Sequence, residues 1–144
     1  MRSIHTEIDI AAAATQVWDI LAAIERWGEW NPFAKVVKGR LAVGERIEVQ
    51  LAPPGQKPTT FRPTIVKLEP GREFRWLGHL GIPGLFDGEH AFRVVPAGAA
   101  RCRLEQLETF HGLLAGPILW LIGDATRRGF VAMNKALKAR AEGG

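Results

Sequence analysis

Apolar residues recur at every second position over most of this chain, and at every third or fourth position at its C-terminal end. From about Leu113 to Ala141 the longer period predicts a single helix. Leu114 to Ile122 is apolar nearly all round, so we expect this part to be enclosed by the closed end of a sheet and by short helices. Such a helix is not stable alone in water, so other elements must cover it. Its apolar stripe consists of Leu119, Ile122, Thr126, Phe130, Met133 and Leu137.

The N-terminal segment shows the shorter period. Apolar and polar residues alternate over Ile4 to Ile10, which predicts a strand with one buried face. A helix then starts at Ala14 or Thr15, and a second short helical turn covers about Glu25 to Trp30. Pro32 ends this turn, because a residue that precedes proline is pushed out of the helical region. We therefore expect two short helices directly after the first strand.

The middle of the chain, from Ala34 to Gly112, alternates in period two between glycine and proline turns. Six such runs with short connections predict an antiparallel meander, which makes seven strands together with the first. The fold class that follows is α+β, with a curved seven-stranded antiparallel sheet wrapped around the C-terminal helix and one domain over residues 1–144. The six runs are Lys35 to Leu41, Arg46 to Ala52, Phe61 to Glu69, Arg72 to Leu80, Phe86 to Val95 and Arg101 to Phe110.

Composition adds limits to this picture. The chain has 144 residues, 47% of them hydrophobic and 24% charged, with a formal charge of +4. Its Lys and Arg residues are scattered, so we expect solubility and no nucleic-acid binding. The longest apolar run, Leu113 to Ile122, is about half of the ~20 residues that span a bilayer, so no stable membrane insertion is expected. Cys102 is the only cysteine, and the N-terminus has no export signal, so cytoplasmic residence is expected.

Four short motifs stand in order along the chain. They are Val17 to Leu21 (VWDIL), Trp30 to Phe33 (WNPF), Gly88 to Phe92 (GEHAF) and Glu108 to Leu114 (ETFHGLL). In this order and spacing, the chain resembles the SRPBCC superfamily, the helix-grip fold of StAR-related lipid-transfer domains and polyketide cyclase/dehydrase proteins. The resemblance covers nearly the whole chain. It implies a cavity between the sheet and the last helix, with the two short helices closing one end.

Three functions are compatible with this resemblance. The first is binding of a small hydrophobic molecule, such as a lipid, a polyketide or an aromatic metabolite, without a cofactor and without evident catalysis. The second is an enzyme of the cyclase or dehydratase type that uses an acid or base in the pocket. The third is a protein-interaction domain, which an exposed apolar patch on the outer face of the sheet would favour. The charged residues of the predicted outer face argue against the third.

Glu108 and His90 are the candidate catalytic residues. Alternation along their strands turns both side chains inward, and a carboxylate that faces an apolar cavity must be hydrogen-bonded, paired or protonated. Glu108 either pairs with Arg103, Arg75 or a backbone group to fix strand geometry, or forms the polar end of a pocket with His90. A one-residue slip in register would turn both side chains outward.

The remaining candidates are mostly apolar. By the resemblance, Trp30 and Phe33 lie at the cavity entrance, where Asn31 either caps the turn or touches a ligand. Phe130 and Met133 form either the floor of the cavity or plain core, and the missing side-chain volume at Ala125, Gly129 and Ala132 can leave room for a guest. The four histidines show no metal-ligand spacing, so no metal site is expected. The expected ligand-binding residues are Trp30, Phe33, Trp76, His90, Phe92, Gln106, Glu108, Phe110, Phe130 and Met133.

Overall fold

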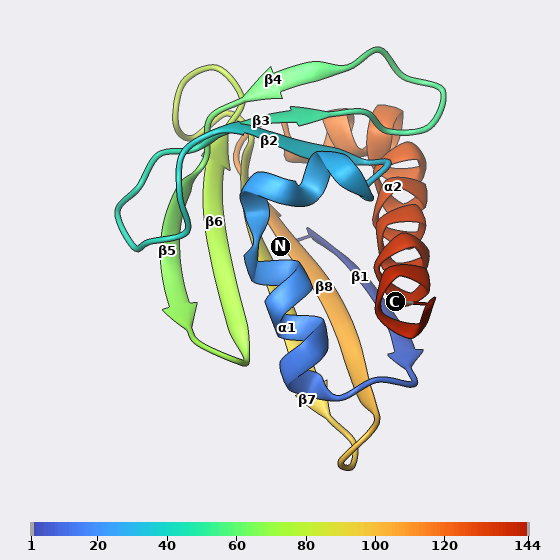
Figure 1. Cartoon of the computed structure of the whole chain (residues 1–144). Helices are drawn as coiled ribbons and strands as arrows, with labels where there is room; N and C mark the ends of the chain where they lie inside the picture. The colour runs from blue at the N-terminus through green and yellow to red at the C-terminus, as the bar shows by residue number, and fades with distance from the viewer. Residues whose placement is uncertain (1, 144) are drawn as a thin grey trace.

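The computed structural model describes residues 2–143 and contains eight strands, two α-helices and one short 3₁₀-helix. A five-stranded antiparallel sheet has the order β1-β8-β7-β6-β5, and a three-stranded sheet has the order β2-β3-β4 (Figure 1). The elements are β1 (Arg2–Ile10), α1 (Ala14–Ala22), η1 (Ile24–Glu29), β2 (Ala34–Lys38), β3 (Glu48–Leu51), β4 (Thr59–Phe61), β5 (Thr64–Glu69), β6 (Glu73–His79), β7 (Asp87–Pro96), β8 (Cys102–His111) and α2 (Ala115–Gly143).

The pattern predicts seven strands, and the structure has eight. The expected strand from Phe61 to Glu69 is divided into β4 and β5 at Arg62 and Pro63. Proline has no N–H to donate to a strand ladder, so the pairing changes partner there. The carbonyl of Pro63 accepts from the N–H of Ile47 at 2.9 Å, and the N–H of Ile65 donates to Glu45 at 2.9 Å. These bonds join the two sheets into one curved surface.

The inner face of this surface follows the predicted alternation. Phe74, Trp76, Phe92 and Leu104 are all buried, and they point toward the helices. Trp27 of η1 packs into the same aromatic cluster, with its ring centroid 5.5 Å from that of Phe92. The outer face is charged and internally paired, as expected from its sequence. The pairs on it are Arg75 with Glu73 and Glu89, Arg93 with Glu73, and Arg103 with Glu7 and Glu105.

The long helix α2 lies along the sheet beside β1 (Figure 1). The shorter helix α1 packs against α2 and against strands β7 and β8. The C-terminal half of α2 packs against the sheet as predicted, since Phe130, Met133 and Leu137 are fully buried. The expectation that its first half is enclosed is wrong, because Trp120 is 85% exposed and Leu121 is 70% exposed.

The short helices explain this gradient along α2. Gln16 of α1 donates to the carbonyl of Ala141 at 2.9 Å, and Arg140 pairs with Glu29 of η1 at 2.8 Å. Both contacts lie at the C-terminal end of α2, so the short helices cover that end and leave the first turns open. Within residues 2–143, no helix combines the length and apolarity that crossing a bilayer requires.

Candidate functional site

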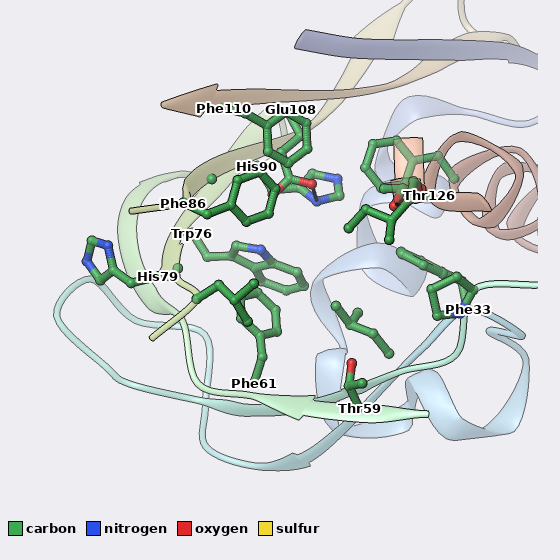
Figure 2. A pocket seen from close by; sticks show the side chains of 17 residues that line it. Phe33, Thr59, Phe61, Trp76, His79, Phe86, His90, Glu108, Phe110 and Thr126 are labelled. Atoms are coloured by element: carbon green, nitrogen blue, oxygen red, sulfur yellow. Dashed lines mark hydrogen bonds and ion pairs between the residues drawn. The ribbon is translucent and has the colours of Figure 1, made fainter. Parts of the chain in front are cut away.

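A cavity lies between the sheet, the first half of α2 and the β3–β4 hairpin (Figure 2). The cavity has a volume of about 190 Å³, and most of its wall is apolar. The wall is formed by Phe33, Leu51, Pro53, Thr59, Phe61, Trp76, Gly78, His79, Leu80, Phe86, Gly88, His90, Glu108, Phe110, Ile122, Thr126 and Phe130.

Strand register places the polar groups of the cavity in one row. Trp76 of β6 stands directly opposite His90 of β7, which stands directly opposite Glu108 of β8. The three side chains therefore point to the same inner face, and Figure 2 shows them together at one end of the cavity.

Glu108 is a mostly buried carboxyl group without a cationic partner. Its side chain is 14% exposed, and the nearest ionisable atom is Nδ1 of His90, 3.6 Å from Oε1. Among the described residues no Arg or Lys pairs with it, because Arg75 and Arg103 pair with acids on the outer face. Burial raises the pKa of Glu108 to about 8. The group is thus mostly a neutral carboxylic acid at neutral pH, able to donate a hydrogen bond.

Gly88 makes room for this carboxyl group. A Cβ atom at position 88 would lie 2.5 Å from Oε2 of Glu108, which is closer than such atoms approach. The glycine of β7 therefore lets the side chain of the neighbouring strand lie flat across it. The Gly88 to Phe92 motif contributes both this glycine and His90 to the cavity wall.

His90 is buried, and its tautomer follows from its hydrogen bonds. The amide nitrogen of Gln106 donates to the carbonyl oxygen of Phe130 at 3.2 Å and to Oδ1 of Asn134 at 2.7 Å. A carbonyl oxygen can only accept, so the amide of Gln106 has one orientation, and its Oε1 faces Nε2 of His90 at 3.0 Å. Nε2 therefore carries the proton, and Nδ1 presents a lone pair toward Glu108.

The same burial keeps His90 neutral. Desolvation lowers the pKa of His90 to about 3, with the hydrogen bond to Gln106 opposing part of this effect. Its ring stacks on Phe92 at a centroid distance of 4.0 Å and packs against Phe130 at 4.6 Å. At neutral pH the cavity thus holds an uncharged acid beside an uncharged imidazole.

A chain of buried amides supports this pair from behind. Asn134 accepts from Gln106 and donates from Nδ2 to Oγ1 of Thr6 at 3.0 Å. The chain connects β7, β8, α2 and β1, and every member is buried. Sequence reasoning missed Asn134 and Thr6. The available signal was the position of Asn134, four residues after Phe130 and hence on the gripped face of α2.

Six of the ten expected ligand-binding residues line the cavity, and four lie elsewhere. Gln106 is behind His90, and Phe92 and Met133 are fully buried in the core. Trp30 packs edge-on against Trp27, with ring centroids 6.1 Å apart. Asn31 caps its turn, because its Oδ1 accepts from the N–H groups of residues 33 and 34. The six that line the cavity are Phe33, Trp76, His90, Glu108, Phe110 and Phe130.

Several wall residues were not expected. Pro53 and Thr59 flank a connection that the period-two pattern does not orient, and Phe61 belongs to the divided strand. The cavity also lies nearer the start of α2 than expected. A Cβ atom on Gly129 would lie 2.3 Å from Cδ1 of Phe33, so the missing side chain there admits this ring and leaves no space for a guest.

One group of potential metal ligands lies outside the cavity. His5, Glu7 and Glu105 bring ligand atoms within 4.8 Å of one another on the outer face of the sheet. Arg103 already contacts both carboxylates, at 3.5 Å for Glu7 and 2.9 Å for Glu105. These acids are therefore partly neutralised by a protein cation, and the group has no connection to the site.

Comparison with known proteins agrees with this architecture. A family model described as polyketide cyclase/dehydrase and lipid transport matches residues 1–142. No curated protein matches the chain.

Three solved structures share the fold at low sequence identity. The ZhuI aromatase/cyclase of Streptomyces sp. R1128 is 18% identical, with a TM-score of 0.77, over 98% of this chain and 93% of that one. Norcoclaurine synthase from Thalictrum flavum, in complex with dopamine and hydroxybenzaldehyde, is 16% identical (TM-score 0.75; 99% and 87% covered). A START superfamily protein from Mycobacterium smegmatis is 19% identical (TM-score 0.70; 98% and 97% covered).

Proposed function

Because the chain belongs to the polyketide cyclase/dehydrase and lipid transport family, we propose that its cavity binds a small, mainly apolar molecule that carries one polar oxygen. The observation that supports this most is the neutral carboxyl group of Glu108 in a mostly apolar wall. Affinity comes from apolar surface removed from water, at about 25 cal/mol per Å². Orientation comes from a hydrogen bond between Glu108 and a carbonyl or hydroxyl oxygen of the ligand.

The charge state of the site favours an uncharged ligand. Glu108 and His90 are both neutral near pH 7, so neither offers an ion pair to a carboxylate or an ammonium group. A charged group would lose its hydration in the cavity without a counter-charge, which is costly. Fatty acids should therefore bind more weakly than alcohols or ketones of similar size.

Two matched aromatic probes test this proposal. We expect naphthol to raise the melting temperature more than naphthalene, because only naphthol can bond to Glu108. The preference for naphthol should be about five- to tenfold in Kd, the value of one net hydrogen bond. Glu108→Leu should abolish the preference while keeping naphthalene binding.

A wider panel of fatty acids, sterols and aromatic polyketides, together with native mass spectrometry of the purified protein, would search for the natural ligand. No shift with any compound would contradict the proposal.

A second candidate is proton-transfer catalysis of the cyclase or dehydratase type. It is favoured by one observation, a carboxyl group with a pKa of about 8 beside the unprotonated Nδ1 of His90. Glu108 could protonate the carbonyl oxygen of a bound ketone while His90 accepts a proton from the adjacent carbon. The low pKa of His90 makes it a weak base, so Glu108 would contribute more of the rate.

The two candidates give different results with one variant. Under the catalytic proposal, Glu108→Gln abolishes turnover of an aromatic polyketide substrate and leaves naphthol binding largely intact, because the amide still forms a hydrogen bond. Unchanged turnover, or loss of binding and turnover together, argues for the binding protein.

A further inference from the structure

Six large apolar side chains are exposed at the end of the molecule that holds the cavity. Trp120 is 85% exposed and Leu113 is 84% exposed, whereas most apolar residues of this size are buried. We call this set the mouth patch. It consists of Leu80, Ile82, Leu113, Leu114, Trp120 and Leu121.

Backbone hydrogen bonds hold the segments of the mouth patch together. The N–H of Leu113 donates to the carbonyl of Gly84 at 3.0 Å, and that of Leu114 donates to Leu85 at 2.8 Å. The β6–β7 loop is thereby fixed against the start of α2, and both lie at the upper end of the molecule in Figure 1. Leu114 directly precedes α2, and its carbonyl accepts from the N–H of Ile118 at 3.0 Å, so it is joined to the first turn of the helix that carries Trp120 and Leu121.

The mouth patch adjoins the cavity directly. Leu80 belongs to both, and Ile122 of the cavity wall follows Leu121. Exposed apolar surface thus continues outward from the cavity wall at Leu80.

Basic side chains flank the mouth patch. Arg2 and His111 share a surface depression with Leu113 at the start of α2. Arg127 and Arg128 are exposed seven and eight residues after Trp120. Asp124 is the exposed acid between them, and Asp87 is engaged by His79 and the N–H of Gly84. The balance of charge is positive, as it is for the whole chain at +4.

We propose that the mouth patch docks on a membrane surface that contains anionic phospholipids. Tryptophan and leucine side chains that protrude beside basic residues suit the boundary between headgroups and acyl chains. Arginine near such a surface is attracted to anionic lipid. A second copy of the chain fits less well, because a symmetric dimer through this patch would bring the net positive charge of both copies to one interface. This inference goes beyond the proposed function, and its test uses the protein without ligand.

Vesicle binding tests the inference. We expect the protein to sediment with phosphatidylglycerol/phosphatidylcholine vesicles and much less with phosphatidylcholine alone. Tryptophan emission should shift to the blue on binding, since Trp120 enters the interface. The double variant Trp120→Ser/Leu121→Ser should weaken binding at least about tenfold, through the loss of buried apolar area. Arg128→Gln should weaken binding only to the anionic vesicles.

Val43→Ser is the matched control. Val43 is an exposed apolar residue in the connection between β2 and β3, outside the mouth patch, so its loss should leave vesicle binding unchanged. The inference is overturned if neither vesicle is bound, if the control weakens binding as much as the double variant, or if phosphatidylcholine alone binds equally well. It is also overturned if light scattering finds a dimer that Trp120→Ser/Leu121→Ser dissociates.

Discussion

At the scale of single residues, the site depends on two groups that both lose their charge on folding. Burial raises the pKa of Glu108 to about 8 and lowers that of His90 to about 3. Folding therefore binds a proton at Glu108 between about pH 4.5 and pH 8, and it releases one from His90 between about pH 3 and pH 6.5. The result is a site that can exchange hydrogen bonds with a ligand without burying a net charge.

The raised pKa of Glu108 predicts that the free energy of unfolding falls as the pH rises toward 8. Because its pKa is raised on folding, its contribution is present below the unfolded pKa and is lost as pH rises through the folded pKa. Between about pH 6.5 and pH 8, Glu108 should lower the free energy of unfolding by about 1 to 2 kcal/mol. Glu108→Gln should remove this decline in urea unfolding. Parallel pH curves for the two proteins would contradict the assigned shift.

The hydrogen-bond chain predicts the tautomer of His90. Nitrogen chemical shifts should show a proton on Nε2 and none on Nδ1, because Gln106 can only accept at this position. Gln106→Leu should leave Nε2 of His90 and Oδ1 of Asn134 without their partner, at a cost of about 2 to 4 kcal/mol in unfolding free energy.

Gln50→Leu is the control for this variant, because Gln50 is an exposed glutamine on β3. Its substitution should change stability by less than about 0.5 kcal/mol. A proton on Nδ1 in the parent protein, or equal effects of the two leucine variants, would be inconsistent with the chain of amides.

At the scale of elements, the spacing of apolar residues predicted most of the helices and strands. It could not predict where a strand is divided or where the cavity lies along α2. Long alternations such as that of β8 predicted the inward direction of Gln106 and Glu108, because register propagates along a strand. The division between β4 and β5 depends on which backbone groups meet Pro63, and pattern alone does not give this. The cavity was placed too far along α2, because a small residue in the sequence can mark either empty space or a neighbour that fills it.

Two glycines of α2 make this last point testable. Gly123→Ala should stabilise the protein by about 0.5 to 1 kcal/mol, since nothing lies within 4 Å of the added Cβ and alanine favours a helix. Gly129→Ala should destabilise it by about 1 to 3 kcal/mol, because the ring of Phe33 must move. Thermal unfolding compares the two directly. Equal changes of the same sign would mean that Phe33 does not occupy the space beside Gly129.

At the scale of the whole molecule, the structure separates a packed end from a hollow end. The packed end holds the aromatic cluster around Trp27 and the buried half of α2. The hollow end holds the cavity, with walls from both sheets and from Ile122 and Thr126 of α2. Filling the hollow end should therefore affect binding more than folding.

Thr126→Phe tests this separation. Its larger side chain should occupy the cavity, so the melting temperature should stay the same or rise while the shift caused by naphthol disappears. Val131→Phe is the control, because residue 131 is more exposed and lies outside the cavity wall. A retained naphthol shift in Thr126→Phe would place the ligand elsewhere.

The uneven burial of α2 also has an evolutionary consequence. Substitutions near Ile122 and Thr126 disturb few buried contacts, whereas substitutions near Phe130, Met133 and Leu137 disturb the core. Related proteins can therefore accumulate substitutions at the hollow end and acquire new ligand preferences with little loss of stability. The gripped half of the helix is the part that selection must keep, and the open half is the part on which diversification can act.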